Sequence, residues 1–175
     1  MPFDRQKFKS LVHYICWKVD DPEKLGATKL NKICWLADFT AYYDLGASIT
    51  DAKYIKRPFG PVPEAIEPTL RQLQLENKLR IREVPFHGQP KKEFISLVDP
   101  SDEMFSPKEL EIIDWATDFV SNIHTAKSIS DASHDHIWQA ATDREEIPYY
   151  TIFAIPGEIT QTEIDWARQE IEGLR

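Results

Sequence analysis

The segment RPFGPVP, residues 57–63, divides the chain into two helical parts. Three of its seven residues are prolines, and each proline holds φ at about −65° and disfavours helix in the residue before it. Gly60 lies between them and supplies a backbone that tolerates positive φ. The segment therefore predicts a stiff turn between helices and not a flexible linker.

Two helices are predicted before this turn. Apolar residues recur with helical spacing from Phe8 to Val19, which indicates a helix over residues 4–19. A second helix is predicted over residues 28–45, with Thr28 as its N-cap and Gly46 just past its end. Apolar side chains lie on two sides of this second helix, which is typical of a central element.

A helix and a hairpin are predicted after the turn. The helix starts near Pro61 or Pro63 and runs to about Asn77, and Pro68 either kinks it or delays its start. Residues 78–84 and 93–98 are strand-like and predict a β-hairpin with a longer loop. Because an isolated hairpin is marginally stable, we expect it to pack on helices or to pair with residues 53–57.

The second half of the chain contains strong helix-start signals. Residues 106–109, SPKE, combine a capping box with a proline at the first helical position, and two apolar stripes follow. We expect this helix to be central, with Trp115, like Trp35 of the earlier helix, in the core. The remaining predicted elements are a short helix over 125–133, a turn over 136–141, an irregular stretch over 143–156 and a final helix over 160–174.

Length and composition fit one domain. The chain has 175 residues, of which 42% are apolar, and this is enough to fill a single core. The sequence therefore predicts an α+β fold that is mostly α, one domain of about six helices with a small β-hairpin or short sheet packed on one side. Cys16 and Cys34 both lie on apolar stripes, which favours buried, reduced thiols over a disulfide framework.

The expected cellular location and the net charge of the protein limit the classes of partner it can bind. No apolar run approaches the roughly 20 residues that span a bilayer, and the N-terminal segment lacks the apolar core of a signal peptide, so we expect a cytoplasmic protein without a membrane partner. The net charge of −8 disfavours general nucleic-acid binding. Residues 53–92 nevertheless carry nine basic and four acidic groups, whereas residues 93–175 carry five and eighteen.

Recognised catalytic motifs are absent from the sequence. The six glycines are not clustered, and no G-x-S-x-G element occurs, so no cofactor and no catalytic residue is expected. The most suggestive polar cluster contains Asp131, His134 and His136, and a metal-dependent or histidine-dependent enzyme is one alternative. The favoured interpretation is local, with Ser133 or Asp131 capping the next turn and His134 satisfying buried backbone groups.

A DNA-binding regulator is the other alternative, because basic residues could share one side of the predicted hairpin. A solvated strand face explains the same pattern more simply. The residues concerned are Lys53, Lys56, Arg57, Arg80, Arg82, Lys91 and Lys92.

Four segments, in order, resemble those of one family. Residues 28–37, TKLNKICWLA, resemble the "K-L-Q-K-L-L-Y-x-A" helix of the SocA-like, or Panacea, antitoxin domain, and residues 59–63 resemble its "Y-G-P-V-x-P" turn. Residues 105–114 are similar to its "L-S-x-E-E-x-x-x-I-D" helix start, and SHDHIW at 133–138 is similar to its late "T/S-H … W" element. The resemblance covers about residues 28–140, so the final predicted helix is an extension of the domain.

The resemblance implies an antitoxin, phage- or prophage-associated, that neutralises a cognate toxin by direct contact. One branch of the family hands its toxin to an AAA+ protease, so such a protease is a second implied partner. Neither a metal nor catalysis is required for this role. The expected partner-binding residues are Tyr54, Arg57, Phe59 and Trp138. The expected structural residues of the motif are Gly60, Pro61, Val62, Pro63 and His134.

Overall fold

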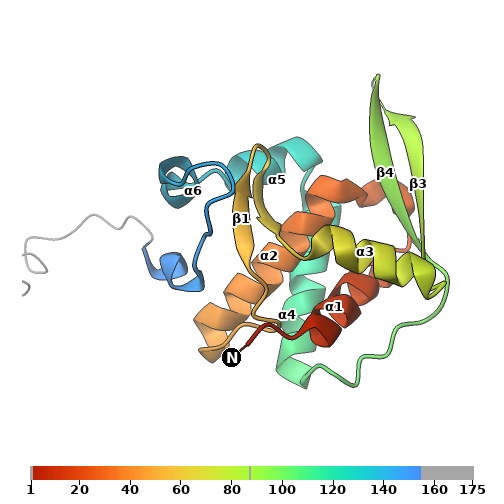
Figure 1. The fold of residues 1–175 in the computed structure, drawn as a ribbon, viewed down its shortest axis with the longest axis horizontal. Helices are drawn as coiled ribbons and strands as arrows, with labels where there is room; N and C mark the ends of the chain where they lie inside the picture. Colours follow the sequence, from red (N-terminus) through yellow and green to blue (C-terminus); the bar gives the residue numbers. More distant parts are fainter. Residues whose placement is uncertain (1, 87, 155–175) are drawn as a thin grey trace, which may run out of the picture.

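The fold is α+β and mostly helical, as predicted (Figure 1). The computed structural model describes residues 2–86 and 88–154, which contain six α-helices and two small antiparallel hairpins. In chain order the elements are α1 (Arg5–Lys18), η1 (Pro22–Lys24), α2 (Gly26–Leu45), β1 (Tyr54–Arg57), β2 (Gly60–Pro63), α3 (Ile66–Leu75), β3 (Leu79–Phe86), β4 (Gln89–Ser96), α4 (Pro107–Asp118), η2 (Phe119–Ile123), α5 (Ala126–Ala132), α6 (His136–Ala140) and η3 (Tyr149–Phe153). The predicted helix over 160–174 lies outside the described residues.

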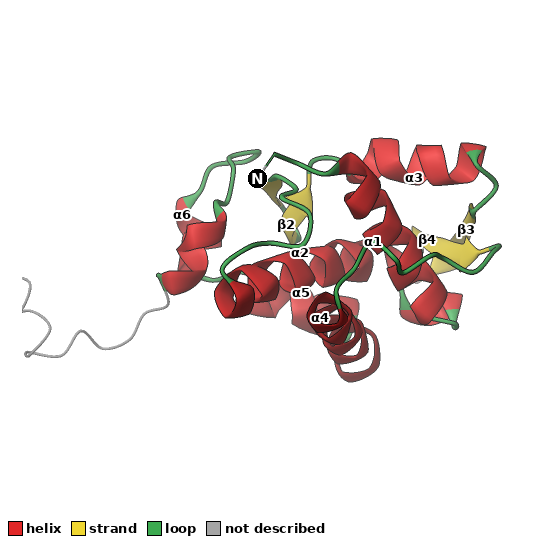
Figure 2. Ribbon diagram, turned by 90° about the horizontal axis from the view of Figure 1, so that it is seen from below, coloured by secondary structure: helices red, strands yellow, loops and turns green. Residues whose placement is uncertain are grey.

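Helix α2 is the central element, which confirms the prediction from its two apolar sides. It packs against α1, α4, α5 and β2, and the side chains of Ile33, Cys34 and Ala37 are completely buried. Figure 2 shows α3 and α4 on opposite sides of α1. Cys16 and Cys34 are both buried free thiols, as expected. None of the described helices is both long enough and apolar enough to cross a bilayer.

The helix ends follow local rules with one exception. Ser106 and Glu109 form the predicted capping box of α4, and Gly46 ends α2 in the left-handed conformation at φ 75°. The prediction of Thr28 as the N-cap of α2 was wrong, because the helix already begins at Gly26 directly after the turn η1. No side chain caps α2 at this end.

Residues 57–63 form a tight hairpin and not only a stiff turn. Strand β1 pairs antiparallel with β2, and the Arg57–Gly60 pair closes a turn that contains Pro58 and Phe59. The prolines of β2 are tolerated because a two-stranded hairpin leaves outer edges that need no ladder bonds. The prediction that α3 starts near Pro61 or Pro63 was wrong. It starts at Ile66, so that Pro68 lies in the first helical turn, where its missing N–H has no intrahelical acceptor to lose.

The second hairpin is longer than predicted. Phe86 pairs with Gln89, so β3 and β4 continue through residues that the sequence assigned to a loop. Leu79 and Phe94 at the base are buried and anchor the hairpin to the helices. This is the first of the two expected arrangements, in which the hairpin packs on helices. The hairpin does not pair with β1, and its distal half projects from the helical body (Figure 1).

Helix α4 is apolar on two sides, but only one of them is fully covered. Ile113 and Ala116 are fully buried against α2, whereas Trp115 is 47% exposed and stacks on Phe119 at the surface. The prediction of Trp115 as a core residue was therefore wrong, because the second stripe is only partly covered: Ile112 and Phe119 pack against the core, but Trp115 does not. Trp35 is half-buried and packs against the core.

A buried carboxylate connects α2 to the chain that enters β1. The Oδ1 atom of Asp38 accepts a hydrogen bond from the Thr50 N–H at 2.9 Å, and its Oδ2 atom accepts from the Thr50 and Tyr54 hydroxyls at 2.7 Å each. Burial raises the pKa of Asp38 to about 6, although the donated hydrogen bonds partly oppose this. Tyr54 is only 1% exposed, so its hydroxyl stabilises the fold and its ring is not available to a partner.

We predict that Asp38→Asn changes how stability depends on pH. Because the native pKa of Asp38 lies above its ordinary value of 3.8, its contribution to stability is fully present below about pH 4 and is lost as the pH rises to about 6. The contribution of Asp38 to the free energy of unfolding should therefore fall by about 3 kcal/mol between low and high pH. Urea unfolding of both proteins between pH 4 and pH 7.5 measures it. The stability of the wild type relative to the variant should fall over this range, and a pH-independent difference would contradict the prediction.

Candidate functional site

Three sequence segments meet beneath the β1–β2 hairpin. Gly60 begins β2 at φ 101°, and a Cβ atom on it would overlap the Nζ atom of Lys32 on α2 and the Oγ atom of Ser133 at the end of α5. Lys32 is almost fully buried, and its ammonium donates a hydrogen bond to the Pro61 carbonyl at 3.2 Å. Only glycine therefore allows the hairpin to lie this close to α2 and α5.

Lys32 is a site residue that the sequence analysis missed. Burial lowers the pKa of its amine to about 7, and no carboxylate among the described residues pairs with it. The available signal was a lysine between the apolar residues Leu30 and Ile33, on a helix expected to be central. A polar group in that position must find a partner, and here the partner is the backbone of the hairpin.

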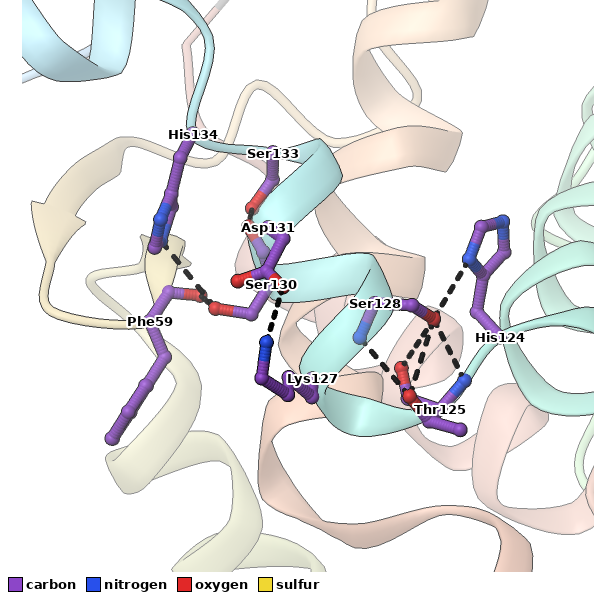
Figure 3. A network of polar contacts seen from close by, with 9 residues as sticks. All are labelled: Phe59, His124, Thr125, Lys127, Ser128, Ser130, Asp131, Ser133 and His134. Carbon is purple, nitrogen blue, oxygen red and sulfur yellow. Dashed lines mark hydrogen bonds and ion pairs between the residues drawn. The ribbon is translucent and has the colours of Figure 1, made fainter.

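Helix α5 holds the hairpin turn through its serines. The Ser130 hydroxyl donates a hydrogen bond to the Phe59 carbonyl at 3.2 Å and lies 3.4 Å from the Nε2 atom of His134 (Figure 3). The Ser133 hydroxyl donates to the Ser130 carbonyl at 2.8 Å. The expected capping of α6 by Ser133 or Asp131 was wrong, because Asp135 caps it by accepting from the Trp138 N–H.

Trp138 on α6 stabilises the hairpin at the end of β1. Its indole Nε1–H donates to the Arg57 carbonyl at 3.1 Å, and its ring stacks on His134 with centroids 3.7 Å apart. The Lys56 ammonium lies 4.3 Å from the ring centroid, in cation–π contact. Burial and the positive charge of Lys32 lower the pKa of His134, which favours the neutral imidazole. The half-buried Trp138 thus supports the hairpin.

The outer edge of β1 is paired as well. The Lys56 N–H donates to the Glu145 carbonyl at 2.9 Å, and the Arg144 N–H donates to the Lys56 carbonyl at 3.0 Å. The Ile147 N–H donates to the Tyr54 carbonyl at 2.8 Å. Contacts from α2, from α5, from α6 and from this segment together restrain the hairpin on several sides.

Phe59 remains uncovered at the tip of this restrained hairpin. Its side chain is 68% exposed, and Figure 3 shows its carbonyl directed at Ser130 while the ring extends away. Arg57 is partly exposed and forms a long ion pair, 3.6 Å, with Asp143. Of the four expected partner-binding residues, the structure leaves Phe59 exposed and Arg57 partly so, whereas Tyr54 is buried and Trp138 half-buried.

The residues of the two alternative sites can also be placed in the structure. Within residues 2–86 and 88–154, no three histidine, cysteine or acidic side chains lie close enough to share a metal ion. Asp131 instead pairs with Lys127 at 2.9 Å. The basic residues are divided between the two hairpins, and several are paired, such as Arg82 with Glu93 at 2.8 Å. The DNA-binding alternative stays a prediction.

The fold and this site define a small α+β domain that presents a restrained hairpin tip to solvent. The family model of the antitoxin SocA-like, Panacea domain matches residues 30–139, more than half of the chain. The protein therefore belongs to this family. No curated protein and no solved structure matches the chain.

We predict that Gly60→Ala destabilises the protein far more than Gly46→Ala. Both glycines have positive φ, but nothing lies within 4 Å of a Cβ atom built on Gly46. Gly46→Ala should therefore cost only the backbone penalty of about 1–2 kcal/mol. Gly60→Ala also displaces the Lys32 ammonium and the Ser133 hydroxyl from their hydrogen bonds and should cost about 2 kcal/mol or more beyond that penalty. Urea unfolding measures both values, and equal losses would show that the close approach is unimportant.

Proposed function

We propose that this protein is an antitoxin that neutralises a cognate toxin by direct binding, without a chemical step, and that the β1–β2 tip is its main contact. The observation that carries the proposal is the exposure of Phe59 on a hairpin whose backbone is held from several sides. Membership of an antitoxin family supports the general role.

The physical argument rests on preorganisation. Binding through a flexible loop loses conformational entropy, whereas a tip already held by Ser130 and Trp138 has little left to lose. Exposed aromatic side chains in such positions supply a large share of binding energy in protein interfaces. Arg57 lies beside Phe59 and can exchange its long contact with Asp143 for an acidic group of the partner.

The setting of the site supports a binding role in the cytoplasm. The Ser130 hydroxyl and the Trp138 indole N–H donate hydrogen bonds to backbone carbonyls of the turn, so both groups have a structural role. The buried free thiols of Cys16 and Cys34 suit a reducing compartment. Delivery of the bound toxin to an AAA+ protease is a further step that the adaptor branch of the family supports.

We predict that Phe59→Ala weakens toxin binding by at least about 30-fold, which corresponds to about 2 kcal/mol. The matched control is Leu75→Ala, because Leu75 is 79% exposed and belongs to α3, away from the tip. The probe is the purified product of the gene adjacent to this one. Calorimetry measures affinity, co-expression measures growth rescue, and thermal unfolding confirms that both variants fold.

Two outcomes would contradict the proposal. The neighbouring gene product could fail to bind the wild type, which would show that it is not the partner of this protein. Alternatively, Phe59→Ala and Leu75→Ala could bind the gene product equally well, which would show that the tip is not the main contact. Because Phe59 is exposed, loss of its side chain should leave stability within about 0.5 kcal/mol of the wild type.

A further inference from the structure

A groove separates the two hairpins. Two adjoining hollows, of about 470 and 460 Å³, share Thr28 and Ala126 in their linings. One hollow lies against the β3–β4 hairpin and is bordered by Phe86, and the other lies against the β1–β2 tip and is bordered by Phe59. Figure 1 shows α5 and the start of α2 between the two hairpins. The groove thus has a helical floor and an exposed phenylalanine at each side.

The hollow beside Phe86 is basic. Its charged lining consists of four lysines and a single glutamate, namely Lys24, Lys29, Lys91, Lys92 and Glu23. The Lys24 side chain is exposed, and its ammonium forms no hydrogen bond or ion pair within the part of the chain that the structure describes, although its backbone N–H donates to the Asp21 carbonyl. The only ion pair of the Lys92 ammonium among the described residues is a long one, 3.5 Å, with the exposed Glu67. This concentration of positive charge stands out on a protein whose net charge is −8.

The positive groups in this hollow repel one another. Lys29 is buried, and burial together with the charges of Lys91 and Lys24 lowers the pKa of its amine. The start of the 20-residue helix α2 lies in the same lining, with no side chain capping its first amides. Its dipole adds further positive potential. The Lys91 side chain passes over this helix end, with its Cε atom 3.5 Å from the position of a Cβ on Gly26.

We propose that this basic groove receives an acidic segment of the same toxin that Phe59 contacts, a proposal that rests on the proposed function. Carboxylates of that segment would pair with Lys24 and Lys92 and accept hydrogen bonds from the first amides of α2. Charge complementarity is the argument, because an acidic ligand relieves the repulsion among the lysines. A protein segment fits better than a nucleic acid, since eighteen acidic groups in residues 93–175 repel a long polyanion.

Charge reversal of the unpaired lysine is the central experiment. Lys24→Glu should weaken binding of the neighbouring gene product about tenfold or more, and Lys24→Gln should show a smaller loss in the same direction. The matched control is Lys108→Glu, which makes the same change in net charge at an exposed position on α4. Affinities are measured at several salt concentrations. The salt dependence should become weaker for Lys24→Glu and stay unchanged for Lys108→Glu.

Zero-length carbodiimide cross-linking tests the contact directly. Mass spectrometry should find Lys24 or Lys92 of the wild type joined to an aspartate or glutamate of the neighbouring gene product. An independent probe is a fluorescent hexaglutamate peptide, which should bind the wild type at low salt, bind Lys24→Glu more weakly, and be displaced by the gene product. Thermal unfolding checks that the variants fold.

The possible failures are distinguishable. If Phe59→Ala weakens binding while Lys24→Glu and Lys108→Glu behave alike, the proposed function stands and the acidic-segment proposal is overturned. If the gene product does not bind the wild type, the proposed function fails, and the proposal for this groove fails with it. If Lys24→Glu abolishes salt-sensitive binding of single-stranded DNA or RNA but leaves toxin binding unchanged, the groove serves nucleic acid instead.

Discussion

The close approach of Gly60 to Lys32 is the constraint on which the rest of the site depends. A buried amine needs a hydrogen-bond acceptor, and the Pro61 carbonyl supplies it only if the hairpin lies directly on α2. That approach leaves no room for a Cβ atom at residue 60. The same contact brings in Ser133, so the packing of α2, β2 and α5 is coupled at one point. A hairpin of two four-residue strands would be unstable without these contacts.

The restrained hairpin explains why one aromatic side chain can stay in water. Ser130 and Trp138 hold the backbone carbonyls on each side of the turn, and residues 144–147 pair with the outer edge of β1. The position of Phe59 is therefore set by its backbone and not by burial of its own ring. Such an arrangement suits recognition, because the conformational entropy of the tip is lost during folding and not during binding.

The two hairpins have different roles in this scheme. The β1–β2 hairpin is short and held on several sides, whereas β3–β4 is anchored mainly at its base and carries Phe86, 53% exposed, near its end. The basic hollow between them lies on a protein that is acidic elsewhere. This asymmetry of charge would orient an acidic partner before short-range contacts form.

Local patterns in the sequence determined the helices and the capping box at Ser106, because these depend on neighbours within a few positions. The need for glycine at residue 60 depends instead on Lys32 and Ser133, which only the tertiary structure brings close. Tertiary structure alone decided which apolar surfaces are covered. Tyr54 is buried where its hydroxyl donates a hydrogen bond to Asp38, sixteen residues earlier. Trp115 is exposed because its stripe is only partly covered by the core. Periodicity identifies a face of a helix but not the element that covers it. The role of Lys32 likewise required three distant segments to meet, which no local pattern encodes.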